Sequence, residues 1–298
     1  MTALLGLGTY RCPDTTEAAL MAVVHGANWV DTAPNYGSGC AEALLRPVLT
    51  SYPDLRVSTK VGFIPPSAGR LGVHSGVLSA ESASRGHCLT PDYITWQTAR
   101  SRRLLGRMPD IVFLHNPEHD CQERDIAGRL YSAFAALEEA CSRRAIGAYG
   151  VATWRGFSSK LLNVSTLLQL AAAAGGSGHH LRAIQLPVSL VHLAPVAEAI
   201  DGRGVLIEAS AAGLDVFASA PLHGGEIPDI VTHELAELIS PGATPAQAAL
   251  SLVASAPGVR RVLLSTSSAE HWRQAADALG RPPLSPDVLR KVVDVLGT

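Results

Sequence analysis

Residues 4–32 read LLGLGTYRCPDTTEAALMAVVHGANWVDT, a stretch that predicts one strand, one helix and a second strand. Its two short apolar runs, LLGLG and NWVDT, are bounded by turn residues, as short buried strands are. Between them, Asp14 or Thr15 can cap the N-terminus of a helix that includes EAALMAVVHGA. A helix between two strands is the usual crossover of a parallel sheet, so this stretch predicts a βα repeat.

The same alternation of strand and helix recurs along the whole chain. Further helix starts are marked at Thr90-Pro91-Asp92 and at Thr244-Pro245, where a capping threonine precedes a proline. Eight repeats of strand then helix close a TIM barrel, so we expect an α/β protein with one (β/α)8 domain over residues 1–298. The eight predicted strands are residues 4–8, 28–32, 56–60, 110–115, 148–152, 183–187, 214–219 and 261–265.

The composition is that of a globular protein with a large core. Of the 298 residues, 47% are hydrophobic and 17% are charged, and no uncharged apolar run is long enough to predict a membrane span. The formal net charge of -2 and the pI near 6.6 argue against nucleic acid or an anionic membrane as a partner. We therefore expect a soluble protein.

The cysteines and histidines predict neither a disulfide framework nor a metal site. The chain has 5 cysteines, an odd number, and no CxxC motif, which is typical of reduced thiols in a cytoplasmic protein. The adjacent His179 and His180 have no acidic or cysteine partner at ligand spacing, so we expect no metal there. The N-terminus lacks the features of a signal peptide, and the expected localisation is cytoplasmic.

Two predicted loops follow strand ends and therefore belong to the mouth of the barrel. The first, residues 61–90, is rich in glycine, serine and proline and is predicted to be a long active-site loop. We interpret it as a loop that gates substrate access, with a disordered insertion as the alternative. The second, residues 187–196, is expected to flank the pocket.

Four polar residues lie at or just beyond the ends of three consecutive predicted strands. Asp31 and Tyr36 belong to WVDTAPNYG, Lys60 closes RVSTK, and His115 closes DIVFLH. Side chains at these strand ends face the active-site mouth of such a barrel, so we expect them on one rim. Each alone is typical of a solvated rim residue, but a carboxylate, a phenol, an ammonium and an imidazole together indicate proton transfer.

These residue types suggest roles. A free phenol has a pKa near 10, and a nearby ammonium stabilises the phenolate, so Lys60 is expected to lower the pKa of Tyr36. Asp31 would hold Lys60 charged and in place, and His115 would orient or polarise a carbonyl oxygen.

The segments GLGTY, DTAPNYG, STKVG and FLHNPE, in this order, resemble the aldo-keto reductase superfamily. The resemblance extends through AIGAYGVATW, AIQLPVSLVH, DVFASAPLHGG and VLLSTSSAEHWRQAADAL. It implies a TIM barrel that binds NADP or NAD across the strand ends. It also implies that Tyr36 is the general acid, assisted by Lys60, Asp31 and His115. The hairpin that usually plugs the barrel floor in this family is expected to be absent.

The resemblance also implies a set of cofactor-binding positions. Ser219 and Gly224 offer a hydroxyl and an unhindered backbone amide to a pyrophosphate. Phe63 and Trp154 are expected to line the substrate pocket. The cofactor-binding positions are Gly8, Thr9, Tyr10, Ala152, Thr153, Gln185, Ser219, Pro221, Leu222, Gly224, Ser265, Thr266, Ser267, Arg273 and Gln274.

The positions that bind adenosine in the family differ in this chain. Many NADPH-dependent members have a lysine, then a serine or threonine, later an arginine, and finally Glu-Asn. The corresponding residues here are Ser265, Thr266, His271, Gln274 and Ala275. Arg273 or the Arg260-Arg261 pair can replace the missing cations. We therefore expect weaker or altered nucleotide binding, and the preference between NAD and NADP stays open.

Three functions are compatible with these features. The first is an NAD(P)H-dependent oxidoreductase that interconverts a small-molecule carbonyl and an alcohol or lactol. The second keeps the barrel and its proton chemistry, through Tyr36 and His115, but has impaired or lost nucleotide binding and is a non-redox dehydratase, isomerase or cyclase. The third is a regulatory or scaffolding subunit without catalysis. Nothing in the sequence predicts the substrate, the reaction direction or the oligomeric state.

Overall fold

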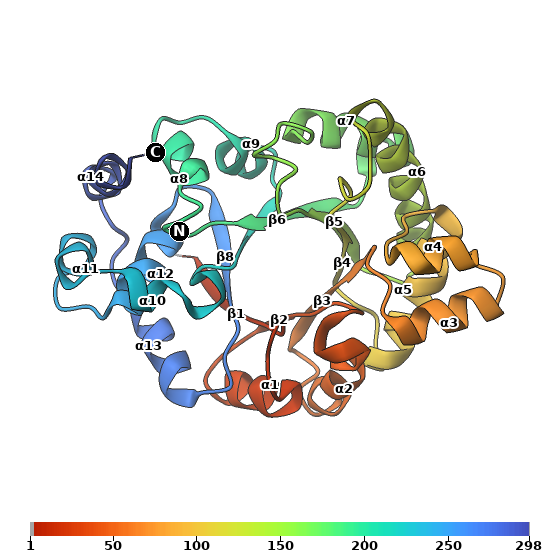
Figure 1. Ribbon diagram of the computed structural model, residues 1–298, viewed down its shortest axis with the longest axis horizontal. Coiled ribbons are helices and arrows are strands. Elements are labelled where there is room, and N and C mark those ends of the chain that lie inside the picture. Colours follow the sequence, from red (N-terminus) through yellow and green to blue (C-terminus); the bar gives the residue numbers. More distant parts are fainter. Residues whose placement is uncertain (1–2, 298) are drawn as a thin grey trace.

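The computed structural model describes residues 3–297, and its centre is a closed barrel of eight parallel strands in sequence order (Figure 1). The first and last strands pair with each other, with Leu4 opposite Arg261 and Leu7 opposite Leu264. The predicted (β/α)8 fold is therefore confirmed, and the strand ends differ from the predicted ones by two residues at most. The strands are β1 (Leu4–Gly8), β2 (Trp29–Asp31), β3 (Arg56–Val61), β4 (Ile111–His115), β5 (Ala148–Ala152), β6 (Leu181–Pro187), β7 (Asp215–Ser219) and β8 (Val259–Leu264).

Alternation along each strand divides the buried side chains between the barrel interior and the layer between strands and helices. The barrel interior is filled by a cluster that includes Trp29, Phe113, Phe217 and Leu263. Their neighbours in sequence on the same strands, such as Val112, point outward and pack against the surrounding helices. The interior is thus a packed core, and polar side chains reach a cavity only at the strand ends.

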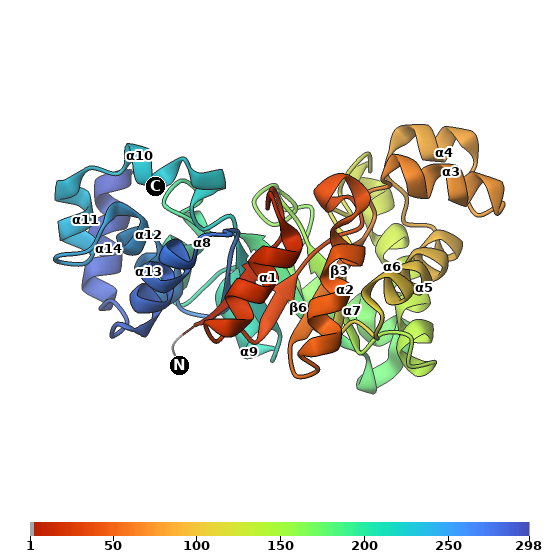
Figure 2. The ribbon, with the colours of Figure 1, turned by 90° about the horizontal axis from the view of Figure 1, so that it is seen from below.

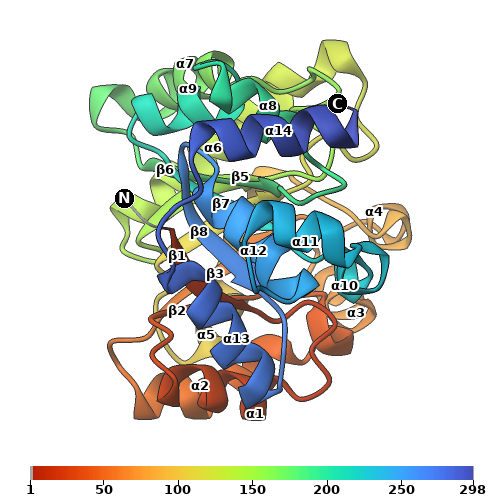
Figure 3. The same cartoon turned by 90° about the vertical axis from the view of Figure 1, so that its left-hand side faces the viewer.

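Helices surround the barrel, and their starts follow the sequence signals. Asp14 caps the first helix by accepting a hydrogen bond from the N–H of Glu17, and Thr244 forms a capping box with Gln247. In Figure 3 the last helix lies across the outside of the barrel beside α8. The principal helices are α1 (Thr15–Val24), α2 (Ala41–Ser51), α5 (Pro91–Leu105), α6 (Glu123–Ser142), α7 (Val164–Gly175), α8 (Ala194–Ile200), α9 (Val205–Ala211), α10 (Ile227–Ile230), α11 (His233–Ile239), α12 (Pro245–Ser255), α13 (Ala269–Gly280) and α14 (Pro286–Leu296).

The segment predicted to be a long active-site loop, residues 61–90, contains regular secondary structure that the sequence analysis did not predict. The segment folds into two helices, α3 (Pro66–His74) and α4 (Ala80–Arg85), which stand out from one end of the molecule in Figure 2. Proline occupies the first turn of α3, and Ser79 caps α4 by accepting from the N–H of Ser82. These local signals, rather than the overall glycine and serine content, determine the conformation.

The base of this helical excursion is fixed to the barrel. Phe63 and His87 form an antiparallel bridge. The N–H of Cys88 donates to the carbonyl oxygen of Gly62 at 2.9 Å, and the N–H of Ile64 donates to that of Gly86 at 2.8 Å. The chain therefore leaves and re-enters the barrel at one point, beside the end of β3.

All five cysteines are free thiols, and three of them are buried. Within residues 3–297 no helix combines the length and apolarity that crossing a lipid bilayer requires.

Candidate active site

A cavity of about 650 Å³ opens at the carboxyl ends of the strands, a size typical of small-molecule sites. Asp31, Tyr36 and His115 line it together with Phe63 and Trp154. Strands and the loops that follow them supply the walls, as in other barrels of this type. The structure therefore brings these predicted site residues together around one space.

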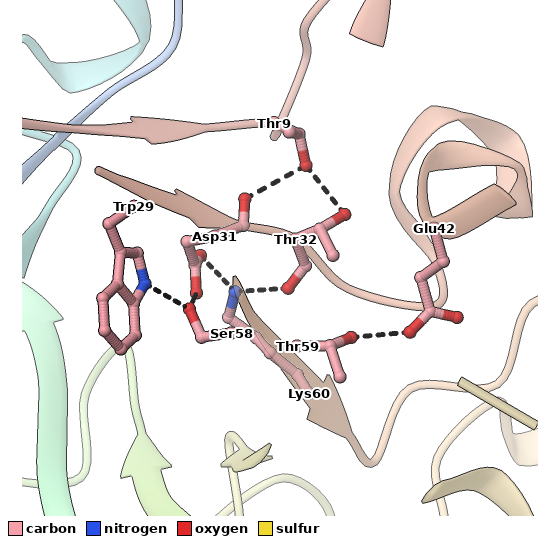
Figure 4. Close-up of polar contacts among 8 residues, drawn as sticks. All are labelled: Thr9, Trp29, Asp31, Thr32, Glu42, Ser58, Thr59 and Lys60. Carbon is pink, nitrogen blue, oxygen red and sulfur yellow. Dashed lines mark hydrogen bonds and ion pairs between the residues drawn. The ribbon is translucent and has the colours of Figure 1, made fainter. Parts of the chain in front are cut away.

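Lys60 lies beneath this cavity and is held by two acceptors. Its side chain is completely buried, and Nζ lies 2.5 Å from Oδ2 of Asp31 and 2.9 Å from the carbonyl oxygen of Thr32 (Figure 4). Burial alone would lower the pKa of Lys60, but the Asp31 carboxylate and the Tyr36 hydroxyl raise that pKa above its ordinary value. Lys60 is therefore an ammonium across the neutral pH range.

Tyr36 begins a short 3-10 helix, η1 (Tyr36–Gly39), and its ring lies over the lysine. The Nζ atom of Lys60 is 4.8 Å from the centroid of the Tyr36 ring, and the ring of Tyr10 packs against it at 5.1 Å. Burial raises the pKa of Tyr36, and the charge of Lys60 opposes this rise without reversing it. The expected net lowering of this pKa is wrong, because loss of water destabilises the phenolate more than an ammonium shared with Asp31 stabilises it.

His115 completes the rim as a neutral imidazole. Its ring lies edge-on to Tyr36, with centroids 6.0 Å apart, and 4.8 Å from the ring of Phe63. Burial holds the pKa of His115 well below its ordinary value, and the charge of Lys60 lowers it further. A neutral imidazole can donate one hydrogen bond to a substrate oxygen without carrying a charge.

A second layer of polar contacts supports the aspartate. Ser58 donates to Oδ1 of Asp31 at 2.7 Å, and Nε1 of Trp29 donates to the Ser58 hydroxyl at 3.0 Å (Figure 4). We did not predict either residue from the sequence. The available signal was a serine in RVSTK two positions before Lys60, on the same face of the strand.

Most of the predicted cofactor positions surround the same cavity. We also missed Arg11, Asn35 and His223, which line it from loops, and His192, whose loop packs its ring 5.4 Å from that of Trp154. This contact places the loop at 187–196 beside the pocket. The predicted cofactor residues that line the cavity are Gly8, Tyr10, Ala152, Thr153, Gln185, Ser219, Pro221, Leu222, Gly224 and Ser265.

The other predicted positions do not line it. Thr9 is fully buried and donates to the carbonyl oxygen of Asp31 and the hydroxyl of Thr32, so its role is to join β1 to β2. Arg273 pairs with Glu270 at 2.5 Å, and Gln274 donates to the same carboxylate at 2.9 Å. Of the two remaining residues, Thr266 accepts from the N–H of Ser268, and Ser267 also lies outside the lining.

The residues around the cavity fit one end of a nicotinamide cofactor. Nε2 of Gln185 and Nδ1 of His223 are buried without a hydrogen-bond partner in the described part of the chain. A bound carboxamide or hydroxyl would satisfy such groups, which are costly when left unpaired. At Gly225 an added Cβ would meet no heavy atom within 4 Å, so its backbone is open to a ligand. Fewer groups are available to bind the adenosine end of the cofactor, because Arg273 is already paired with Glu270.

A (β/α)8 barrel with tyrosine, lysine, aspartate and histidine around one cavity defines the class of protein. The chain belongs to the aldo/keto reductase family, whose model matches residues 3–296. It is 33% identical over 135 residues to the D-threo-aldose 1-dehydrogenase of a Pseudomonas species. That match spans 42% of this chain and 40% of the curated relative.

Solved structures share the fold over nearly the whole chain. The thermostable aldo-keto reductase Tm1743, in complex with the inhibitor epalrestat, is 19% identical, with a TM-score of 0.70 over 98% of this chain and 94% of that one. The holo form of aldo-keto reductase AKR11C1 from Bacillus halodurans is 16% identical, with a TM-score of 0.69 over 100% and 93%. An aldo-keto reductase from Klebsiella pneumoniae in complex with NADPH is 21% identical, with a TM-score of 0.64 over 98% and 90%. At these identities the likeness shows the fold.

Proposed function

We propose that this protein is an NAD(P)-dependent oxidoreductase that interconverts a carbonyl and an alcohol or lactol. One observation carries the proposal: the buried Lys60 ammonium lies between the Asp31 carboxylate and the ring of Tyr36, at the base of the cavity. A buried charge is costly, so an ion pair placed under a phenol supports a role in proton transfer.

Tyr36 is the proposed acid in the reduction direction. Because its pKa is raised, the phenol carries its proton at neutral pH and can donate it to a carbonyl oxygen. The Lys60 ammonium then stabilises the phenolate that remains. In the oxidation direction the same phenolate takes the proton of the substrate hydroxyl. Asp31 keeps Lys60 charged in both directions.

His115 is the proposed orienting group. His115 ends β4 and Tyr36 follows β2, two strands away in the barrel. The neutral ring of His115 faces Tyr36, so both side chains can reach one substrate oxygen. Phe63 and Trp154 form walls beside it. When bound, a nicotinamide cofactor supplies or accepts the hydride at the carbon. Gln185 and Thr153 would hold its carboxamide, and the turn at Ser219 to Gly225 would hold its pyrophosphate.

The names of the related proteins favour the redox function over a non-redox dehydratase, isomerase or cyclase, because they are reductases and a dehydrogenase. The partial match to an aldose dehydrogenase makes aldoses, whose cyclic forms are lactols, the first substrates to test. Both NADP and NAD are candidate cofactors.

The test follows the absorbance of reduced nicotinamide with NADPH and NADH, and in the reverse direction with NADP and NAD. The substrate panel contains aldehydes, ketones, alcohols and aldoses. We expect turnover that Tyr36→Phe lowers by at least about 100-fold, the usual contribution of a general acid. Absence of turnover across the panel, together with absence of nucleotide binding by calorimetry, would reject the proposal.

A further inference from the structure

The two carboxylate oxygens of Asp31 have different donors. Oδ2 faces Nζ of Lys60 at 2.5 Å, and Oδ1 accepts from the Ser58 hydroxyl at 2.7 Å (Figure 4). Asp31 and Ser58 are direct neighbours in the pairing of β2 with β3. Each oxygen is therefore fixed by a separate group on β3, and the plane of the carboxylate is defined by both.

Trp29 and Asp31 together fix the directions of the two Ser58 hydrogen bonds. An indole N–H can only donate, so the Ser58 oxygen must accept from Nε1 of Trp29 at 3.0 Å. The single hydroxyl proton of Ser58 is donated to Asp31, whose carboxylate can only accept. The contact from Trp29 thus fixes the Ser58 oxygen in place and leaves its proton directed at the carboxylate.

Trp29 is itself held in one orientation. It is 1% exposed and lies in the barrel interior against Phe217, with ring centroids 5.2 Å apart. The guanidinium groups of Arg56 and Arg261 lie over the indole, 4.6 Å and 4.7 Å from its centroid. The strand register produces this arrangement, since Arg56 pairs with Trp29 and Arg261 pairs with Phe217.

We propose that Ser58 and Trp29 are positioning residues, which fix Asp31 in the orientation that keeps the Lys60 ammonium under Tyr36. Neither residue lines the cavity, so neither can act on substrate directly. Their side-chain hydrogen bonds reach the site through Asp31. The proposal rests on the proposed function of Tyr36 as the acid and base of an oxidoreductase.

The test compares Trp29→Phe, which keeps a buried aromatic ring and removes the N–H, with the control Phe113→Leu in the same interior cluster. The control loosens the same layer of the barrel and leaves the hydrogen bonds intact. Ser58→Ala is the second variant. For Ser58→Ala we expect kcat to fall by about tenfold, the effect of one hydrogen bond to a charged group. For Trp29→Phe, which removes a hydrogen bond to a neutral hydroxyl, we expect a fall of a few-fold. In both, KM for nucleotide should be nearly unchanged.

The pH profile distinguishes positioning from general damage. In the oxidation direction kcat should rise with pH as Tyr36 ionises. A less well oriented Asp31 holds Lys60 less firmly, so the midpoint should move to higher pH in both variants and stay in place in Phe113→Leu. An equal shift in the control, or unshifted profiles in both variants, would overturn the proposal.

A second measurement does not depend on turnover. The chain has three lysines, Lys60, Lys160 and Lys291, so isotope-labelled lysine gives three NMR signals, and Lys60→Met assigns the buried one. We expect the Lys60 signal to titrate at lower pH in Trp29→Phe and Ser58→Ala than in the wild type, and the other two to stay unchanged. An unmoved Lys60 titration overturns the positioning role. A moved titration in a protein that turns over no substrate supports this role and rejects only the proposed function.

Discussion

The Nε2 atom of His87 lies 2.8 Å from the carbonyl oxygen of His115, so a residue outside the barrel holds the backbone of the candidate active site. His87 closes the excursion that carries α3 and α4, and its ring also packs against Phe63 at 5.0 Å. The approach requires glycine at position 62, where an added Cβ would lie 2.7 Å from the His115 oxygen and 2.8 Å from Nε2. The excursion and the cavity wall are thus one structural unit.

Replacing His87 should therefore reduce both stability and activity. His87→Leu removes the ring nitrogen that bonds the His115 carbonyl, and we expect a loss of about 1–3 kcal/mol in the free energy of unfolding. His87→Gln retains an amide donor and should lose less of the free energy of unfolding. Urea denaturation measures both, and His74→Leu on the exposed end of α3 serves as the control. Equal stability of His87→Leu and the wild type would contradict a supporting role.

The same histidine makes stability depend on pH. Burial lowers the pKa of His87 from its ordinary 6.5 to about 4, so the unfolded chain binds the proton more readily than the folded protein does. The stabilisation is complete above about pH 6.5 and is lost as the pH falls toward about 4. The contribution is at most about 3 kcal/mol. Urea denaturation across this range should show a steeper decline for the wild type than for His87→Gln.

Replacing one partner of the buried ion pair should destabilise the protein more than replacing both partners. Lys60→Met leaves the Asp31 carboxylate buried and uncompensated, and we expect it to cost about 3–5 kcal/mol of stability. The double variant Lys60→Met with Asp31→Asn should recover part of this loss. A double-mutant cycle measured by chemical denaturation gives the coupling between the two side chains. Additive losses would show that the pair is not coupled.

The preference between the two nicotinamide cofactors should respond to Glu270. This carboxylate holds both Arg273 and Gln274 on α13, which keeps the arginine from acting as a free cation. Glu270→Ala releases Arg273, and we expect binding of NADPH to strengthen a few-fold relative to NADH. Calorimetric titration of both cofactors measures the ratio, with Arg273→Ala in the same background as the control. An unchanged ratio would show that Arg273 does not reach the nucleotide.

Sequence patterns were sufficient to predict the barrel because the features that determine it are local and are repeated along the chain. Each βα unit contains an apolar run, a capping residue and a helix, as in LLGLG followed by Asp14. The rim residues followed from the same pattern, since Asp31 and His115 end their strands and parallel strands end together. The excursion at 61–90 was misread because its helices are short and its composition is typical of loops.

By itself, the sequence determined the closed (β/α)8 barrel, the family and the gathering of Asp31, Tyr36, Lys60 and His115 at one end. Only the tertiary structure decided how these groups behave. The pKa of Tyr36 is raised because neighbouring strands and loops surround it at the cavity wall and remove part of its hydration. The orientation of Asp31 depends on Ser58 and Trp29, which strand register brings beneath it. Burial and hydrogen-bond direction arise from contacts between distant segments, and no local pattern encodes them.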